Sequence, residues 1–376
     1  MPERGTLGSD EAYTIAWIVH HPHELTAANA MLDERHNEPQ GFHARKHIND
    51  QVSYSWGRIG HHCIVIASLA DHNIEPSKVA VIVRSLQASL SHIRIGFLVG
   101  TASGLPGEKV SRSGEAVAKR DVRLGDIVVG SPGPDADTTL RSNVVQFDCG
   151  DSDNDSISLD QRVDLPGPPL ALKSALMTLQ SEHELDGSKI SEIIEMTLQR
   201  YPNLKKSYSN PGIEKEWDER DSDSESDSED EPSCTPDRLF KASYDHVGGS
   251  NCSDCDADGE IKRKKRKAAG PKIHFGPTVS LSCLIKTTGF RERLVARLLE
   301  EQDLDALCME TEAYGLSKAF PCLLIRGICD YGDAHRYDSW RKYAALSAAA
   351  FTKELLGFVS VVDVERMPGI GELPRY

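Results

Sequence analysis

The segment PCLLIRGICDYGDAH, residues 321–335, changes abruptly from apolar to polar. Its first half is a short run of large apolar residues, which is typical of a strand buried in a sheet. Its second half brings Asp330, Tyr331, Asp333 and His335 together within a few residues. Because ligands bind at the carboxyl ends of strands in open α/β sheets, this junction predicts either an active site or an ordinary surface loop.

Segments with strand and helix patterns alternate around this stretch. Apolar or alternating runs predict strands, and amphipathic runs predict helices. Such alternation is typical of an α/β fold with a largely parallel central sheet. Strands are expected at residues 13–19, 94–100, 125–130, 143–148, 272–280, 305–311 and 322–330, a β-hairpin at 51–69, and helices from residue 22 and at 77–90, 168–180, 188–200, 291–301, 313–319 and 339–356.

The alternation of strand-like and helix-like segments ends between residues 205 and 270, where acidic, serine-rich and basic blocks replace the apolar residues. A segment with few apolar and many charged residues cannot bury enough surface to offset its chain entropy, so disorder is expected. The predicted organisation is one α/β domain in two parts, 11–205 and 271–358, with a disordered acidic and basic insertion at 206–270 and a C-terminal tail at 359–376.

Composition and charge exclude several functional classes. Of the net charge of −15, the segment 214–231, with eleven acidic and two basic residues, contributes −9, so the rest is only moderately acidic and no nucleic-acid partner is expected. No apolar run is long enough for a membrane span, and the first residues lack a secretory segment. Nine cysteines, several of them within apolar strands, are typical of the reduced thiols of an intracellular protein.

The expected location is therefore cytoplasmic. The basic run KRKKRK, residues 262–267, has the composition of a nuclear import signal, which would add the nucleus. A solvated charge run that balances the acidic block is the alternative interpretation.

Two segments contain part of a metal-binding motif, but neither motif is complete. Residues 151–162 start with three alternating aspartates, like a calcium loop, but lack the glycine and the final glutamate that such a loop needs. Cys252 and Cys255 form one CxxC pair, and without a second pair this is a weak zinc signal. No metal site and no cofactor are predicted.

Three further segments place polar or small residues where predicted strands end. Glu24 follows the first strand, and Glu310 and Glu312 lie on either side of a strand end. Glu310 and Glu312 have a plain structural interpretation, because a carboxylate at a helix start is often only a cap. A turn of small residues would let backbone N–H groups approach a ligand, and the segment GTASG supplies Gly100, Thr101, Ala102, Ser103 and Gly104.

Six motifs occur in order along the chain: YTIAWIVHHPHELTAANAML, RIGFLVGTASGLP, KRDVRLGDIVVG, VVQFDCG, LCMETEAYGL and FPCLLIRGICDYGDAH. Together they resemble the nucleoside phosphorylase and nucleosidase superfamily, most nearly the domain at the front of fungal multidomain proteins of the innate-immunity type. The resemblance covers residues 11–205 and 271–357. It implies a three-layer α/β/α sandwich around a mixed, partly barrel-like sheet, and an enzyme that cleaves an N-glycosidic bond.

The resemblance also implies a role for each strand-end carboxylate. Asp330 would protonate or hydrogen-bond the departing purine, Glu312 would accept hydrogen bonds from the ribose hydroxyls, and Glu24 would position the attacking water. The chemistry agrees, because bond cleavage develops positive charge on the sugar and negative charge on the base. The substrate-binding residues implied in this way are Glu312, Thr311, Ser280, Gly100, Thr101, Ala102, Ser103 and Gly104.

The nucleophile distinguishes hydrolysis, in which water attacks, from phosphorolysis, in which inorganic phosphate attacks. Phosphate needs arginines or a dense nest of N–H groups, and related bacterial-type phosphorylases carry an arginine where this chain has Leu98. A nucleosidase that uses water is therefore predicted, with a phosphorylase that takes inorganic phosphate as co-substrate as the alternative.

A catalytically degenerate nucleoside-binding or signalling module is a second alternative. Its basis is that Thr311, Leu281 and Ser282 stand where the superfamily has Met, Gly and Asn. The expected partners are a small-molecule nucleoside or nucleotide and, as is common in the superfamily, further copies of the chain in a homo-oligomer.

Overall fold

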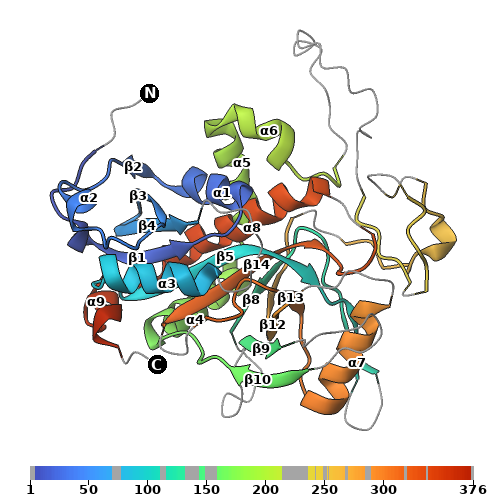
Figure 1. Cartoon of the computed structure of the whole chain (residues 1–376). Helices are drawn as coiled ribbons and strands as arrows, with labels where there is room; N and C mark the ends of the chain where they lie inside the picture. Colours follow the sequence, from blue (N-terminus) through green and yellow to red (C-terminus); the bar gives the residue numbers. More distant parts are fainter. Residues whose placement is uncertain are drawn as a thin grey trace.

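The computed structural model of the chain describes residues 5–69, 78–110, 116–131, 144–148, 159–213, 236–241, 243–248, 252, 254–266, 270–283, 289–316, 320–335 and 338–373. Figure 1 shows a central sheet covered by helices on both faces. Within the described ranges, twelve strands form one mixed sheet that does not close into a barrel, and two further strands pair separately. The predicted α/β class, with a sheet between helical layers, is confirmed.

Most elements lie where the sequence patterns predict them. The strands are β1 (Tyr13–Ile18), β2 (Glu34–His36), β3 (Ser53–Ile59), β4 (His62–Ser68), β5 (Ile95–Gly104), β6 (Gly107–Val110), β7 (Ala116–Arg120), β8 (Ile127–Val129), β9 (Val144–Asp148), β10 (Asp160–Asp164), β11 (Ile273–Phe275), β12 (Thr278–Leu281), β13 (Cys308–Glu310) and β14 (Cys322–Asp330). The helices are α1 (Pro22–Met31), α2 (Phe42–Arg45), α3 (Lys78–Ser89), α4 (Leu170–Asp186), α5 (Ile190–Arg200), α6 (Pro202–Tyr208), α7 (Phe290–Gln302), α8 (Asp338–Leu356) and α9 (Val361–Glu365).

Strand β5 joins the parts of the sheet. Along one edge it pairs in parallel with β1 and then antiparallel with β13, and along the other edge it pairs in parallel with β14. This pairing continues through residues 100–104. The turn predicted for Gly100, Thr101, Ala102, Ser103 and Gly104 is therefore wrong: these residues form the second half of β5, because strands on both sides use their backbone groups.

The two faces of the sheet bury different side chains. Along β1, Ile15 and Trp17 join a hydrophobic cluster with residues of α1, α4, α5 and α8, whereas Tyr13 and Ile18 join a cluster with residues of α3. A strand covered on both faces needs apolar side chains on both. A third cluster joins α7 to β9, β12 and β13. The core therefore lies in layers on either side of the sheet.

Helix α8 packs directly on β14 at Gly327. A Cβ at this position would lie 1.9 Å from the carbonyl oxygen of Ala344. Only glycine allows the two backbones to come so close, and α8 is buried along most of its length. This contact fixes the position of β14, the strand within the segment 321–335.

Part of the interval 206–270 is folded, and the expected disorder does not hold for residues 236–241, 243–248 and 254–266. Phe240 and Cys255 are buried, and Figure 1 shows this segment, in yellow, beside the body of the domain. A few apolar residues are enough here because they pack against an existing core rather than forming a new one. The acidic block 214–231 and residues 151–158 of the calcium-like segment lie outside the described residues.

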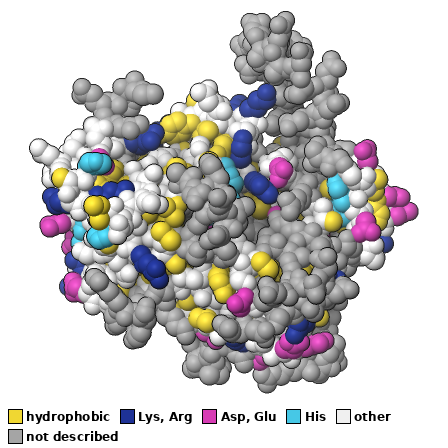
Figure 2. Space-filling view, viewed as in Figure 1, with side chains coloured by type: hydrophobic (Ala, Val, Ile, Leu, Met, Phe, Trp, Pro, Cys, Tyr) yellow, Lys and Arg dark blue, Asp and Glu magenta, His cyan; other side chains and the backbone are white. Residues whose placement is uncertain are grey.

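No single helix in the described part of the chain has the length and hydropathy of a membrane span. Two helical segments, Asp338–Leu356 and Val361–Glu372, meet these criteria only when combined, and they are bent by 90° relative to each other. On the described part of the face in Figure 2, basic and acidic side chains are interspersed with apolar ones.

Candidate functional site

Glu24 lies in the first turn of α1, directly after β1. Its Oε2 accepts hydrogen bonds from the backbone N–H groups of His20 (3.1 Å) and His21 (2.9 Å), as in a helix cap. Its Oε1 accepts one from the backbone N–H of Thr101 (2.8 Å), and the Thr101 hydroxyl lies 3.2 Å from the same oxygen. Because the bonds to Thr101 reach across to β5, Glu24 does more than cap its own helix.

The two glutamates of the segment METEA share one arginine. Arg326 of β14 donates through Nη2 to Glu310 (2.7 Å) and through Nη1 to Glu312 (2.5 Å). Glu310 also accepts from the backbone N–H groups of Glu312 (2.8 Å) and Ala313 (3.0 Å), which fixes the bend after β13. Residues 313–316 of the helix predicted at 313–319 form bends and a turn instead, and the remaining three residues lie outside the described part.

Glu24, Glu312 and Arg326 meet at Gly100 of β5. A Cβ on this glycine would lie 2.4 Å from Arg326 Nη1, 2.8 Å from Glu24 Oε1 and 2.8 Å from Glu312 Oε2. Glycine is therefore required for the charged groups to reach the strand. Glu24, Gly100, Glu310, Glu312 and Arg326 are referred to below as the Gly100 cluster.

The Gly100 cluster contains three carboxylates and one guanidinium. Burial raises the pKa of Glu310, and Arg326 acts in the opposite direction. Burial disfavours the charge on Arg326, but the neighbouring glutamates outweigh it and raise the pKa of Arg326 above its ordinary value. Arg326 therefore stays protonated, and the cluster is net negative when Glu24 and Glu312 are ionised.

His21 also faces the Gly100 cluster. Its Nε2 lies 3.9 Å from Glu312 Oε1, and one oxygen or nitrogen of each of His21, Glu24 and Glu312 lies within 4.8 Å of the others. Such a trio could hold a divalent cation, but Arg326 already pairs with Glu312 and would repel one. The arrangement suits neutral hydroxyl groups better, since carboxylate oxygens accept their hydrogen bonds without a change in net charge.

Asp330 lies at the last position of β14. In the register with β5 it stands opposite Ser103, whereas Arg326 stands opposite Gly100. Three residues of strand separate the two positions, which corresponds to about 10 Å. Asp330 is buried, with 6% exposed, and its Oδ1 accepts a hydrogen bond from the Gly332 N–H (2.9 Å). The predicted acid thus lies further along β14 than Arg326, the residue that pairs with the predicted ribose carboxylate Glu312.

The remaining predicted residues lie on the neighbouring strands. Ala102 and Ser103 are buried in β5, and Gly104 pairs with β13. Ser280 of β12 is fully buried and also pairs with β13, and Thr311 is half-buried just after β13. The fold therefore gathers the predicted site residues from five segments around the carboxyl end of β5.

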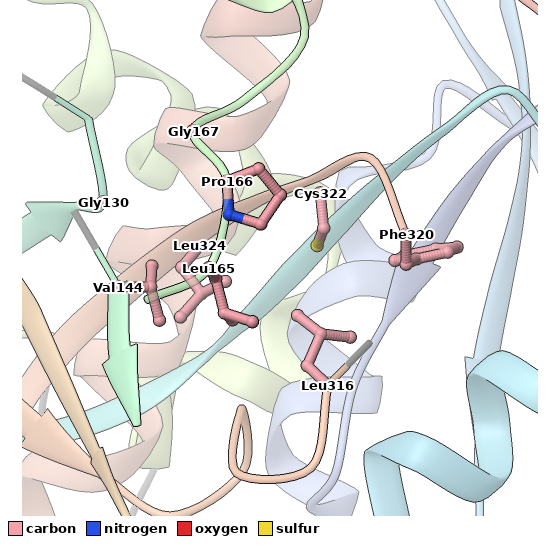
Figure 3. Close-up of a pocket in the computed structure, with 9 residues that line it drawn as sticks. All are labelled: Gly130, Val144, Leu165, Pro166, Gly167, Leu316, Phe320, Cys322 and Leu324. Carbon is pink, nitrogen blue, oxygen red and sulfur yellow. The ribbon is translucent and has the colours of Figure 1, made fainter. Parts of the chain in front are cut away.

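Three cavities in the described part of the structure lie elsewhere. The one in Figure 3 has a volume of about 10 Å³, lies between β9, β14 and the segment before α4, and has room for about one water molecule. The other two, of about 500 Å³ and 620 Å³, lie beside α5 and α6. None of these three is lined by Glu24, Glu312 or Asp330, so the convergence of side chains, rather than a cavity, identifies the candidate site.

His23, next to Glu24 in the first turn of α1, gives the chain a pH-dependent stability. Burial lowers the pKa of His23 from 6.5 to about 4, and nearby His21 adds to this effect. The unfolded chain therefore binds this proton more readily, so stability is complete above pH 6.5 and falls as the pH drops towards 4. We expect His23→Gln to reduce the fall in the free energy of unfolding across this window, measured by urea denaturation at several pH values.

His43→Gln is the matched control, because His43 is exposed on α2. Its pH profile should follow that of the wild type. Parallel profiles for His23→Gln and the wild type would show that His23 is not held neutral by burial.

Two members of the site, Arg326 and His21, were not predicted. Arg326 had a signal in the sequence, since it is an arginine within a run of apolar residues. A buried arginine needs carboxylate partners, but the spacing along the chain does not reveal which ones. His21 had no signal that separated it from the neighbouring histidines.

Comparisons with known proteins give one similar sequence and a group of similar structures. No protein-family model matches the chain. It is 34% identical over 352 residues to a nucleotide-binding leucine-rich repeat (NLR)-like protein of the fungus Hyaloscypha variabilis, and this match covers 93% of the chain but 30% of the relative. The chain thus spans under a third of that relative. The relative's name and source agree with the fungal multidomain type expected from the motifs.

Similar solved structures include one hydrolase and one nucleosidase. The futalosine hydrolase of Helicobacter pylori has a TM-score of 0.47 and 12% identity, with 93% of this chain and 99% of that chain covered. The 5'-methylthioadenosine/S-adenosylhomocysteine nucleosidase of Neisseria meningitidis, in complex with methylthio-immucillin-A, has a TM-score of 0.45 and 12% identity, with 92% and 98% covered.

Proposed function

We propose that the chain cleaves the N-glycosidic bond of a purine nucleoside or nucleotide, with water as the nucleophile. The observation that carries this proposal is the meeting of Glu24 and Glu312 at Gly100, with Asp330 further along the adjoining strand. Carboxylates at both ends of a substrate suit a reaction in which the sugar becomes positive and the base becomes negative.

Each carboxylate has one role in the proposed reaction. Glu24 takes a proton from a water molecule while the oxygen of that water attacks the anomeric carbon. Glu312 accepts hydrogen bonds from the ribose hydroxyls. The bond from the anomeric carbon to the base nitrogen breaks, and its electron pair moves into the base. Asp330 donates a proton to the imidazole part of the base, which leaves as the free purine. Arg326 holds Glu312 in place through its hydrogen bond to Glu312 Oε2.

The charge of the Gly100 cluster favours water over phosphate. Arg326 is fully buried and engaged by Glu310 and Glu312, so its charge is already compensated. Phosphate would place further negative charge beside the carboxylates, and anion sites are usually built from uncompensated arginines or N–H groups. The backbone of residues 100–104 is an extended strand and does not form the N–H nest that a phosphate would need.

A purine panel assayed with and without phosphate tests the proposal. Purified chain is incubated with adenosine, methylthioadenosine and ATP, and both the free base and the sugar product are measured by chromatography. We expect free base and unphosphorylated sugar in phosphate-free buffer. Release that requires phosphate would replace the proposal with phosphorolysis. Binding by calorimetry without any release would identify a nucleoside-binding module instead.

A further inference from the structure

Four metal-ligand side chains from two distant segments meet outside the proposed active site. His246, Cys252 and Cys255 belong to the folded part of the interval 206–270, and His335 belongs to the loop after β14. One ligand atom of each lies within 4.8 Å of the ligand atoms of the other three. Neither cysteine is in a disulfide. These four residues are referred to as the Cys2His2 cluster.

The distances within the Cys2His2 cluster fit a tetrahedral ion. His335 Nδ1 lies 3.7 Å from Cys252 Sγ and 3.8 Å from Cys255 Sγ, and His246 Nδ1 lies 3.8 Å and 3.4 Å from the same two sulfurs. Ligands arranged tetrahedrally around zinc at usual bond lengths place each sulfur about 3.6 Å from each nitrogen. All four sulfur–nitrogen distances are close to this value.

A second layer of hydrogen bonds orients the ligands. His335 Nε2 lies 3.0 Å from the backbone carbonyl of Tyr244, so this nitrogen carries the proton and Nδ1 presents its lone pair to the cysteines. Arg238 donates to the backbone carbonyls of Cys252 and Cys255 and thereby fixes the CxxC turn. The ring of Phe240 stacks on His335 at a centroid distance of 4.0 Å. Such outer partners are typical of metal-bound histidine and cysteine.

Hydrogen bonding alone does not account for the Cys2His2 cluster. Two thiols supply one weakly donated proton each, whereas four sulfur–nitrogen contacts are present. Cys252, Cys255 and His335 are buried, with 1%, 6% and 5% exposed, so water does not readily complete the set. One cation bound by two thiolates and two neutral imidazoles satisfies all four ligands at once.

We propose that the Cys2His2 cluster binds one structural zinc ion. Four protein ligands close the coordination sphere, which is typical of structural rather than catalytic zinc. The ion would join the folded part of the interval 206–270 to His335, five residues after Asp330. Arg291 of α7 supports the same junction, since it donates to the Phe240 carbonyl (3.1 Å) and to Asp333 (2.9 Å). The ion thus holds the inserted segment against the loop that follows the proposed acid.

The sequence alone does not predict this zinc site, because a single CxxC pair is a weak signal. The pair is completed by His246, nearby in the sequence, and by His335, which lies 80 residues after Cys255. That separation does not match the spacing of any short zinc motif. Folding, rather than local spacing, brings the fourth ligand to the other three.

Metal analysis of the full chain tests the zinc site without any enzyme assay. Wild type purified under reducing conditions without added chelator is expected to contain about one zinc per chain, measured by plasma mass spectrometry. After chelation, addition of cobalt(II) should give the visible absorption of a tetrahedral ion and thiolate charge-transfer bands. Substoichiometric zinc together with no such bands in the reduced wild type would overturn the proposal, whether or not the chain has nucleosidase activity.

Single substitutions locate the ion. Changes to residues that only hydrogen-bond to metal ligands weaken metal binding by about 10- to 100-fold. Loss of a ligand itself should have a larger effect. We therefore expect Cys252→Ser, Cys255→Ser and His335→Ala each to weaken cobalt binding by more than this. Cys63→Ser is the matched control, because Cys63 is another cysteine outside disulfides and lies in β4. Equal cobalt spectra in Cys63→Ser and the three ligand variants would place the metal elsewhere. The wild-type titration decides the question if a variant does not fold.

Discussion

Replacing Asp330 with asparagine is expected to lower kcat for nucleoside cleavage by about 10²- to 10⁴-fold, the usual contribution of a general acid. Asparagine has nearly the same size, and its side-chain oxygen can still accept the hydrogen bond from the Gly332 N–H. It cannot deliver a proton to the leaving base. Steady-state kinetics of base release should therefore show a large loss in kcat, while urea denaturation shows a nearly unchanged free energy of unfolding.

Asp338→Asn is the matched control for this experiment. The Asp338 side chain is 75% exposed at the start of α8, so the same chemical change there should leave kcat and stability as in the wild type. Undiminished turnover in Asp330→Asn would remove Asp330 from the mechanism. A loss of activity accompanied by unfolding would instead indicate a structural role.

Arg326→Met is expected to lower the free energy of unfolding by about 3–5 kcal/mol, because removing one partner of a buried ion pair leaves the other charge uncompensated. Arg326 is fully buried and pairs with Glu310 and Glu312, whose side chains are only 2% and 7% exposed. Methionine fills much of the space but offers neither carboxylate a hydrogen bond. Denaturation by urea, followed by circular dichroism, measures the change.

Two further variants test why Arg326→Met lowers the free energy of unfolding. One tests the burial of the ion pairs, and the other tests the uncompensated carboxylate. Arg58→Met breaks the surface pair of Arg58 (36% exposed) with Glu34 (56% exposed) and should leave the free energy of unfolding nearly unchanged, because solvent screens exposed pairs. Glu310→Gln combined with Arg326→Met should be more stable than Arg326→Met alone, since one uncompensated carboxylate is removed. A similar loss of free energy of unfolding in Arg58→Met and Arg326→Met would show that the buried ion pairs stabilise the fold no more than the surface pair does.

The basic run 262–267 illustrates how tertiary contacts change the meaning of a charge pattern. Its sequence alone indicates either an import signal or a solvated charge run. In the structure, Arg263 pairs with Asp237 (2.8 Å) and donates to the Tyr331 hydroxyl (2.9 Å), and Arg266 pairs with the buried Asp126 (2.5 Å). These arginines hold the inserted segment on the domain, so the run is more than a solvated face. Its role in nuclear import stays a prediction.

Residues 100–104 show a different limit of sequence patterns. Gly, Thr, Ala, Ser and Gly in succession are typical of a turn, because small residues tolerate tight backbone angles. In the structure they stay extended, since β13 and β14 pair with them from opposite edges. The small side chains serve another purpose there: Gly100 leaves room for Glu24, Glu312 and Arg326.

The sequence by itself determined the α/β class, the place of most helices and strands, and the strand-end carboxylates Glu24, Glu312 and Asp330. These features depend on local periodicity and on residue type, which are visible within short windows of the chain. Only the tertiary structure decided that Arg326 joins Glu310 to Glu312 and that His335 completes the cysteine pair. Such contacts join residues far apart along the chain, and their partners are selected by how the whole core packs, which no local spacing records.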